Sequence, residues 1–511
     1  MKKITMICMA ALLLLAASCK KEKEEINEPA GEESVFSVET EVHSGDSKTH
    51  LEGARVIWDS NDAIKVINGK EIPQVQVFSF SKYVDEGDKT VAEFSAENLP
   101  AGFYTPNYTG YYPSTIGNDG SFTMEQTQTY AAGSFASGVN PMKAVSNNKV
   151  LPFKNACGVL KLQLRSNEEV IVEKIIVRSK SEEKLWGNGS INSEGAFTVT
   201  NGGSNTIELD CSQADPEVIL SPSKTTPTTF FIVLPVGTLS NGFEVEVIDK
   251  DSHGNWTVGT TKDNTIIRSR IRQMPVCTVK IGVQLYAGGP YWATCNLGAT
   301  SPTRYGDYYA WAETEPYYTS LSWNDPTMPT VDNWKSGKEN GYCWKSYPNN
   351  SATTSDNGFN EWDPVPFDGD NNLLPKYDAA NQYAWEADEG TWYIPTASEF
   401  ETMIAKTSHT YTSNYKGTGI AGRIYQGTTT GYTDRSIFLP CAGYFWNTTF
   451  YQGDDGYDEA NYTTATRYYS ATSTTYKAYR FHYYSNHKYH TWDGDGLRRY
   501  FGETIRPVKR N

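Results

Sequence analysis

Hydrophobic and polar residues alternate along the first half of the chain. In three segments every second residue is apolar or β-branched: Phe36, Val38, Thr40 and Val42; Leu160, Leu162 and Leu164; and Phe243, Val245 and Val247. Successive side chains of a strand point to opposite faces, so each segment can bury one face of a sheet. The continuous apolar run at 230–235 predicts a central strand, and Pro235 ends its pairing. Because no helical periodicity precedes residue 280, the pattern predicts packed β-sheets.

Helical spacing appears in the second half. In the segment 395–406, Thr396 can cap the first turn while Glu399 reaches back to it. The apolar stripe of this segment consists of Ala397, Phe400, Met403 and Ile404. The segment therefore predicts a helix. A weaker helical pattern covers 378–387, and strands with glycine turns are expected beyond residue 420.

The first 18 residues have the layout of a secretory signal. Lys2 and Lys3 precede a mostly apolar run from Ile4 to Ala17, and small residues lead to Cys19. A run of about 14 residues is shorter than the about 20 that span a bilayer as a helix, so a permanent transmembrane anchor is not expected. The chain is expected to leave the cytoplasm.

The residues before Cys19 resemble a bacterial lipobox. That resemblance implies cleavage at the cysteine and attachment of lipid to its thiol. The charged segment that follows, at 19–33, is expected to be a solvated tether. It is similar to the surface-export signals of Bacteroidetes lipoproteins, which implies a lipid-anchored protein on the outer face of the bacterial outer membrane. The alternative is an ordinary cleaved signal followed by a chance cysteine.

Composition bounds the number of domains and excludes one class of partner. A chain of 511 residues is long for one hydrophobic core, so two or three are expected. The formal net charge of −15 argues against nucleic acid, whose phosphates would be repelled. Of the 34 tyrosines, 28 lie after residue 280, as do 10 of the 13 tryptophans. This change in composition places a domain boundary near Lys280.

Cysteine spacing assigns no metal site and no disulfide. Six cysteines remain without the leader: Cys157, Cys211, Cys277, Cys295, Cys343 and Cys441. None has the CxxC spacing of a zinc or redox site, and six cysteines allow 15 pairings. Cys441 lies in the apolar run 437–444 and is expected to be free and buried.

Four segments before residue 280 resemble, in order and spacing, the fimbrillin family of Bacteroidetes pilus subunits and surface lipoproteins. They are 47–69, 108–114, 151–164 and 230–237. The resemblance implies two transthyretin-like β-sandwiches, at 34–145 and 146–280. They would follow the signal peptide at 1–18 and the tether at 19–33.

Seven segments after residue 280 are similar to the Fibrobacter succinogenes major paralogous domain. They are 291–300, 306–316, 377–380, 392–400, 436–444, 467–472 and 502–509. The resemblance implies that 281–511 is an α+β domain related in architecture to C-type lectin-like and formylglycine-generating folds. Tyr469 departs from the family, which usually has tryptophan there. The expected fold class is mainly β and multidomain: two transthyretin-like β-sandwiches followed by an α+β lectin-like domain.

Patterns associated with catalysis and nucleotides are weak in this chain. The GxGxxG spacing at 417–422 lacks the preceding strand and the following helix of a dinucleotide site. On a strand, His482 and His490 face the side opposite to His487, and no close Cys, Asp or Glu completes a zinc set, so exposed histidines are expected. Neither HExxH nor GxSxG is present. No catalytic residue is assigned, and the protein is not expected to be an enzyme.

Acidic clusters make calcium the candidate metal. They lie at 368–372, 453–459 and 493–496 and offer the oxygen ligands that calcium prefers. The candidate ligands are Asp454, Asp455, Asp493 and Asp495. Asp-Gly pairs are also ordinary hairpin turns, so both interpretations stay open. No other cofactor is expected.

The aromatic excess of the second half points to a binding surface. Tyrosine and tryptophan offer a flat apolar face with a polar edge, which suits a sugar ring or another protein. In the loop-like stretch 444–462, the candidate ligand-binding residues are Trp446, Asn447, Tyr451, Asp454, Asp455 and Tyr457. Most of the other tyrosines are expected to fill a core that is short of Leu and Ile.

Together these features predict a surface-exposed outer-membrane lipoprotein that acts in adhesion. Its expected partners are the membrane through the lipid, a glycan or a host or bacterial protein, and pilus subunits. Fimbrillin relatives polymerise by strand donation after cleavage at a basic residue, which makes Arg55 a candidate maturation site. The bulky C-terminal domain favours a pilus tip adhesin over a repeating subunit. The alternatives are a glycan-binding accessory lipoprotein of a polysaccharide-uptake system and an enzyme on the lectin-like scaffold.

Overall fold

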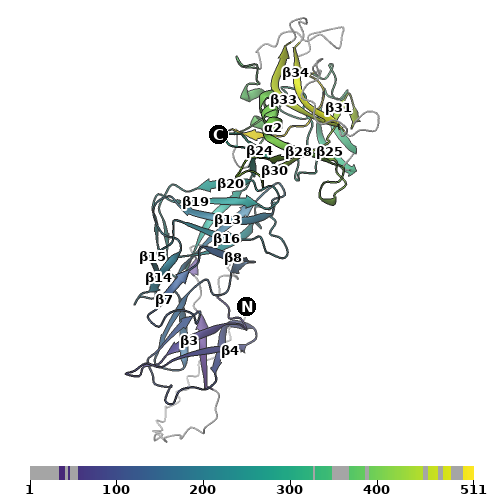
Figure 1. Cartoon of the computed structure of the whole chain (residues 1–511). Coiled ribbons are helices and arrows are strands. Elements are labelled where there is room, and N and C mark those ends of the chain that lie inside the picture. Colours follow the sequence, from purple (N-terminus) through teal and green to yellow (C-terminus); the bar gives the residue numbers. More distant parts are fainter. Residues whose placement is uncertain are drawn as a thin grey trace, which may run out of the picture.

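The computed structural model is built almost entirely from β-strands (Figure 1). It describes residues 34–40, 44–45, 56–325, 328–347, 367–385, 391–452, 459–469, 476–484 and 499–510. Nine sheets, among them one closed barrel, divide the described residues into three bodies. The predicted class, mainly β and multidomain, is confirmed. No helix occurs among the described residues before residue 280, as the hydrophobic pattern predicted.

Seven strands of the first body close into a barrel. In order around it they are β1 (Ser34–Thr40), β11 (Val150–Asn155), β10 (Met142–Ser146), β6 (Tyr108–Tyr112), β3 (Ala63–Ile67), β4 (Val75–Asp85) and β5 (Asp88–Ala96). Phe36 and Val38 of β1 are fully buried, as their alternation predicted. Trp58 packs edge to face on Phe94 and Tyr112, with ring centroids 5.0 and 5.3 Å apart. The barrel core is therefore largely aromatic.

The second body is a sandwich of two main sheets with smaller ones at its ends. One main sheet has the order β17 (Thr228–Leu234), β12 (Gly158–Arg165), β22 (Arg270–Thr278) and β2 (Ser44–Gly45). The other contains β20 (Asn255–Gly259), β19 (Phe243–Asp249), β13 (Val172–Ser179), β16 (Thr206–Asp210), β8 (Thr127–Ala131) and β9 (Ser134–Phe135). The smaller sheets are formed by β15 (Phe197–Asn201), β14 (Gly187–Ile191) and β7 (Ser121–Met124), and by β18 (Gly237–Leu239) and β21 (Asn264–Ile266).

The chain crosses between the first two bodies more than once. Strands β7 and β8 precede β10 in the sequence but pair with β14 and β16 of the second body. The side chain of Gln128 on β8 both donates to and accepts from the backbone of Val233, at 2.7 and 3.0 Å. A single boundary between residues 145 and 146 is therefore wrong: it falls inside β10, a barrel strand. Strand parity could not reveal this exchange, because it does not specify which distant strand is the partner.

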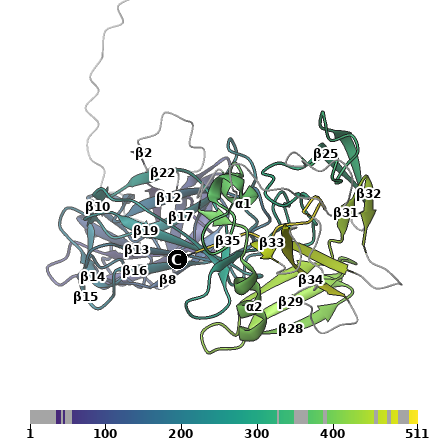
Figure 2. The same cartoon turned by 90° about the horizontal axis from the view of Figure 1, so that it is seen from above.

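The C-terminal body packs a short helix against small sheets (Figure 2). Its strands are β23 (Gly282–Gln284), β24 (Tyr291–Ala293), β25 (Tyr318–Asp325), β26 (Met328–Trp334), β27 (Trp392–Tyr393), β28 (Thr407–Thr412), β29 (Gly422–Gly427), β30 (Ser436–Pro440), β31 (Tyr444–Trp446), β32 (Thr449–Tyr451), β33 (Glu459–Tyr469), β34 (Tyr476–Tyr484) and β35 (Val508–Lys509). Its helices are η1 (Pro375–Tyr377), α1 (Ala379–Gln382), α2 (Ala397–Lys406) and η2 (Tyr415–Gly417). Helix α2 lies against β28, β29, β33 and β34.

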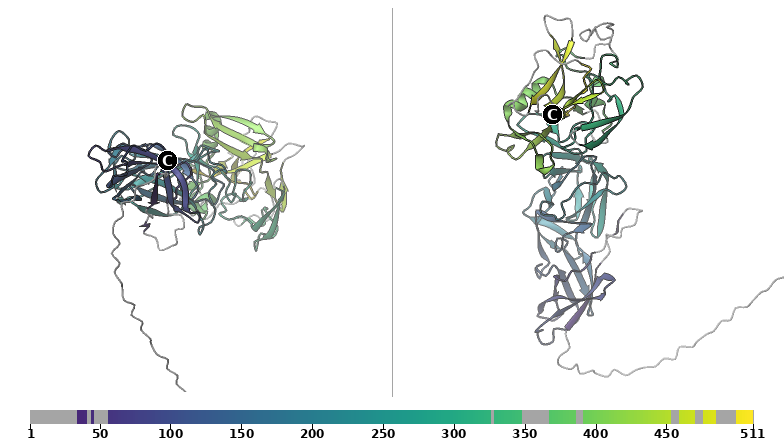
Figure 3. Two further views of the ribbon diagram at one scale, coloured as in Figure 1. Left: turned by 90° about the horizontal axis from the view of Figure 1, so that it is seen from below. Right: turned by 90° about the vertical axis from the view of Figure 1, so that its right-hand side faces the viewer.

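One sheet runs from the second body into the C-terminal body. Its ten strands include β20 of the second body, next to β23, and the C-terminal strands β24, β35 and β27. The two bodies join where Asn255 pairs with Gly282. Their apolar residues also form one continuous cluster that includes Trp256, Trp292 and Phe400. The three bodies thus stand in a row, and the upper two share a sheet and a core (Figures 1 and 3).

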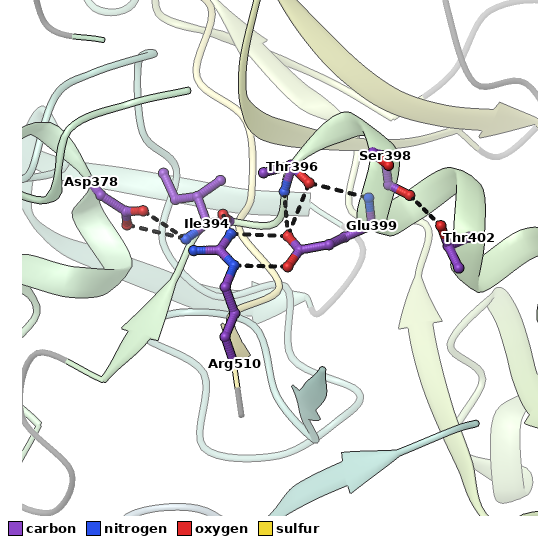
Figure 4. A network of polar contacts seen from close by, with 7 residues as sticks. All are labelled: Asp378, Ile394, Thr396, Ser398, Glu399, Thr402 and Arg510. Carbon is purple, nitrogen blue, oxygen red and sulfur yellow. Dashed lines mark hydrogen bonds and ion pairs between the residues drawn. The ribbon is translucent and has the colours of Figure 1, made fainter. Parts of the chain in front are cut away.

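Helix α2 begins as its sequence predicted (Figure 4). The hydroxyl of Thr396 accepts the Glu399 amide at 3.2 Å, and the Glu399 carboxylate accepts the Thr396 amide at 2.7 Å. Glu399 also binds Arg510 through both carboxylate oxygens, at 2.8 and 3.0 Å. The weaker prediction at 378–387 was too long: α1 is only four residues, because Tyr383 takes an extended conformation.

Most described tyrosines of the C-terminal body fill its core. The buried ones include Tyr305, Tyr308, Tyr309, Tyr317, Tyr318, Tyr342, Tyr347 and Tyr500. None of the six described cysteines, all after residue 150, is in a disulfide, and Cys441 is fully buried, as predicted. Within the described residues, no helix has the length and hydrophobicity needed to cross a membrane.

Candidate functional site

Three of the predicted ligand-binding residues lie on one hairpin, formed by β31 and β32. Trp446 ends β31, Asn447 lies in the turn, and Tyr451 ends β32. The other predicted site residues lie outside the described part of the chain: Cys19, Arg55, Asp454, Asp455, Tyr457, Asp493 and Asp495. The hairpin is therefore the part of the predicted site whose geometry can be described.

Asn447 shapes and anchors the hairpin turn through its backbone. Its φ angle is 53°, a left-handed conformation that Asn tolerates better than most residues. Its amide donates to the Tyr342 carbonyl at 2.9 Å, and its carbonyl accepts the Tyr342 amide at 2.8 Å. This pairing fixes the hairpin to the body, so the described role of Asn447 is structural.

Alternation along the hairpin sorts its rings onto two faces. Phe445 is 1% exposed, and Phe450 packs against the same core, so both form the inner face. The outer face begins with Tyr444 and Trp446, which flank Phe445 on β31 and therefore point to the other side of the strand. Tyr451 pairs with Tyr444 across the hairpin and lies on the same outer face.

A fourth ring, from the end of the chain, completes the outer face. Tyr444 stacks on Tyr451 with centroids 5.3 Å apart and planes at 15°, and on Phe501 at 5.5 Å and 9°. Trp446 contacts Phe501 at 5.8 Å and Tyr451 at 6.1 Å. Each of the four rings thus contacts two others. We refer to Tyr444, Trp446, Tyr451 and Phe501 as the aromatic platform.

Backbone pairing places Phe501 in the platform. The next residue, Gly502, exchanges two hydrogen bonds with Phe445, at 2.8 and 3.0 Å. A Cβ atom on Gly502 would lie 2.8 Å from the Tyr342 ring, so only glycine permits this approach. Sequence reasoning missed Phe501 because the contact depends on this long-range pairing; the nearest signal was the adjoining segment 502–509.

The platform displays its rings to solvent. Trp446 is 37% exposed, while the other three rings are half-buried. Among the described residues after 280, Trp446 is the one large hydrophobic side chain that counts as exposed. Stacked aromatic faces bind the apolar face of a sugar ring or an aromatic side chain, and none of the four side chains carries a charge.

A buried charged cluster lies beside the base of the hairpin, where the backbone of Glu459 pairs with that of Gly443 and Gln452. The Glu459 carboxylate is 3.2 Å from Nε2 of His482 and 3.9 Å from Arg480. Burial alone would raise the pKa of Glu459, but His482, Asn461 and Arg480 together hold it below its ordinary value. Burial raises the pKa of Glu503 to about 7, although Arg480 opposes the shift.

His482 corrects an expectation from the sequence. It was predicted to be exposed, yet it is only 6% exposed: it lies on β34, pairs with Asn461 of β33, and faces the buried Glu459 carboxylate. His487 and His490 lie outside the described residues. In the part of the chain that the structure describes, no three His, Cys, Asp or Glu side chains are grouped to hold a metal ion.

Comparisons with known proteins show likeness of structure only. No protein-family model matches this chain, and no curated protein does. Solved structures similar to it include a candidate cell adhesion protein from Bacteroides ovatus, with 13% identity and a TM-score of 0.31, covering 48% of this chain and 92% of that one. A fimbrial protein from the same species has 11% identity and a TM-score of 0.22, covering 53% of this chain and 59% of that one.

A candidate polysaccharide-binding protein from Bacteroides thetaiotaomicron is also similar. It has 9% identity and a TM-score of 0.22, covering 43% of this chain and 78% of that one. At such identities and scores these structures carry no conclusion about what this chain binds. Its candidate site is therefore defined by its own geometry, as an exposed platform of four uncharged rings.

Proposed function

We propose that this protein is a lipid-anchored surface adhesin that contacts its ligand through the aromatic platform. The observation that carries the proposal is the platform itself. Two segments far apart in the sequence are held together by paired backbone so that four rings share one outer face. A core would cover such rings, whereas Trp446 is displayed to solvent.

A neutral glycan is the ligand class that fits the platform best. The rings of the platform offer flat apolar faces with polar edges, which match the apolar face and the hydroxyls of a sugar ring. The side chains of the platform offer no charge to select an ionic ligand. Calcium binding by Asp454, Asp455, Asp493 and Asp495 stays a prediction from the sequence.

A glycan array probed with the full chain tests the proposal. The full chain is used because the core of the C-terminal body continues into the second body. We expect binding of a neutral glycan that Trp446→Ala removes and that Trp186→Ala, a half-buried tryptophan of the second body, leaves intact. Arrays run with and without calcium show whether glycan binding depends on the calcium site that the sequence predicts. A folded chain that binds no glycan, or a Trp446→Ala variant that binds as well as the wild type, refutes the platform as a glycan site.

The same proposal includes proteolytic cleavage of the chain at Arg55 and a position at the tip of a pilus. Strand β1 lies between β5 and β11, and its Phe36 and Val38 are fully buried. Cleavage at Arg55 would detach β1 from the rest of the barrel and open a groove that a neighbouring strand could fill. Treatment with an arginine-specific protease should remove the segment before residue 56. A chain that stays intact there, or never joins a polymer, contradicts this part.

A further inference from the structure

A cavity of about 200 Å³ lies in the second body, between its two main sheets. Strands β12 and β22 of one sheet and β19 and β20 of the other supply its lining. The lining includes the side chains of Gln163, Val258, Thr260, Met274 and Cys277. We refer to this space as the sandwich cavity, and it shares no residue with the aromatic platform.

The sandwich cavity lies at the side of the second body where both sheets end. In the part of the chain that the structure describes, β2 pairs with only the first two residues of β22, and β23 with only the first residue of β20. Beyond these positions no described strand covers the outer edge of β20 or β22. Val258, Met274 and Cys277 pack against the core of the second body, yet they are only partly buried.

A β-bulge in β22 shapes the rim of the cavity. Along β12 the pairing advances by two residues, from Lys161 to Gln163, while along β22 it advances by three, from Gln273 to Val276. The extra residue bends the bulged strand and interrupts its ladder of hydrogen bonds. The side-chain amide of Gln163 donates to the Met274 carbonyl at 2.9 Å and so fixes the backbone of Met274 at the rim.

The chemistry of the lining selects an uncharged ligand. No lining side chain carries a charge, so a charged ligand would lose its hydration without gaining a counter-charge. The two polar side chains already have partners in the second body: Gln163 donates to Met274, and the Thr260 hydroxyl accepts the Phe243 amide at 3.1 Å. The cavity therefore favours a neutral and largely apolar molecule.

The size of the cavity and the sulfur in its lining favour one aromatic ring. Drug-sized ligands usually occupy about 300–1,000 Å³, whereas an apolar cavity of about 150 Å³ in another protein binds benzene. A volume of about 200 Å³ thus suits a single ring with a small substituent. Thioether sulfur makes favourable contacts with aromatic rings, so Met274 favours an aromatic ring over an aliphatic ring of the same size.

We propose that the sandwich cavity binds one small, neutral aromatic ring. The ring would lie between Val258 of one sheet and Met274 of the other, and it would cover the thiol of Cys277. Binding would remove these partly exposed apolar side chains from water, which supplies the driving force. This site goes beyond the adhesin proposal and does not depend on it.

The rate at which a maleimide labels Cys277 in the folded full chain tests this inference. Among the six described cysteines Cys277 is the partly exposed one, and mass spectrometry of its peptide separates its labelling from that of any other thiol. Burial raises the pKa of the Cys277 thiol, so all rates are compared at one pH.

The probes are benzyl alcohol, its aliphatic match cyclohexylmethanol and its anionic match benzoate. We expect benzyl alcohol to slow the labelling in a saturable manner. Half-protection should need an about five-fold lower concentration of benzyl alcohol than of cyclohexylmethanol, because only the aromatic ring gains the sulfur contact. Benzoate should not protect at these concentrations, because its carboxylate would have to be desolvated.

Three variants locate the binding site. Val258→Phe places a ring in the cavity, so labelling of Cys277 should be slow without a probe and unchanged by one. Thr257→Phe is the matched control: it adds the same ring to the neighbouring, exposed residue of β20, on the opposite face, and should behave as the wild type. Met274→Leu conserves volume but removes the sulfur, so it should weaken protection by benzyl alcohol about five-fold and leave that by cyclohexylmethanol unchanged.

Thermal unfolding establishes that each variant is folded. Trp446→Ala should be protected as the wild type is, which separates this cavity from the platform. The inference is overturned if benzyl alcohol does not slow the labelling of the folded wild-type chain, or if cyclohexylmethanol or benzoate protects equally well. It is also overturned if benzyl alcohol still protects the Val258→Phe variant as it protects the wild type.

Discussion

Glu168 and Lys280 form a buried ion pair between the second body and the start of the C-terminal body. Thr294 adds a hydrogen bond from its hydroxyl to the Glu168 carboxylate, at 3.4 Å. Nearby, the Glu169 amide donates to the Thr300 carbonyl at 2.7 Å. Loss of either partner would leave the charge of the other buried without compensation, which is strongly destabilising. The pair therefore holds the two bodies in one relative position.

Removing the carboxylate should therefore destabilise the junction. Glu168→Gln leaves the Lys280 ammonium buried without its counter-charge, and we expect the free energy of unfolding to fall by about 3–5 kcal/mol. The matched control is Glu315→Gln. Glu315 pairs with Lys335 at 2.6 Å but is 76% exposed, so its loss should cost about 0–1 kcal/mol. Denaturant titration followed by tryptophan fluorescence measures both, and equal effects would contradict the role given to the buried pair.

Gly502 should be intolerant of a side chain. Gly502→Ala places a methyl group 2.8 Å from the Tyr342 ring, and the resulting overpacking should cost about 1–3 kcal/mol. Phe501 would move with the backbone, so glycan binding by the platform should weaken as well. Gly369→Ala is the control, because nothing lies within 4 Å of its Cβ position. The measurements are the thermal unfolding and the glycan binding of the two variants. A Gly502→Ala variant as stable as the control would refute the close approach of Gly502 to the Tyr342 ring.

Local patterns predicted local structure well. The capping box and apolar stripe of α2 are contained within the segment 395–406, so no distant partner was needed to recognise them. The parity of Phe36 and Val38 likewise reported which face of a strand is buried. The barrel and the strand exchange were not predictable, because they depend on pairings such as Glu208 with Thr127 across distant parts of the chain.

The same limit applies to the candidate site. Trp446 and Tyr451 were found from composition, because aromatic residues gather between 444 and 462. Phe501 was not found, since it joins the platform only through the pairing of Gly502 with Phe445. The burial of His482 was missed for a related reason: the alternation of a strand shows two faces but not which of them another layer covers.

Glu503 should make stability depend on pH. Burial raises its pKa to about 7 in the folded chain, from an ordinary value of 4.5. The folded state therefore holds its proton more tightly than the unfolded state does. Its contribution is fully present below about pH 4.5 and is lost as pH rises towards 7, by roughly 3 kcal/mol.

Comparison with Glu503→Gln isolates this contribution. Asp378, whose pKa burial raises to about 6, titrates in the same direction in both proteins. We expect wild-type stability to fall more steeply than that of the variant between pH 5 and pH 7. Denaturant midpoints at half-unit intervals give the two slopes. Parallel curves would show that Glu503 is ionised in the folded chain throughout this range.

The N-terminal cap of α2 should contribute measurably to the C-terminal body. The helix is short, so the amides of its first turn, which have no partner within the helix, are a large share of its backbone donors. The Thr396 hydroxyl accepts a hydrogen bond from one of them, the Glu399 amide. Thr396→Ala should lower the free energy of unfolding by about 1 kcal/mol. Thr396→Ser keeps the hydroxyl and should be close to the wild type. Thermal unfolding of the two variants is the measurement, and equal losses in both would mean that the methyl group of Thr396, rather than the cap, stabilises the helix.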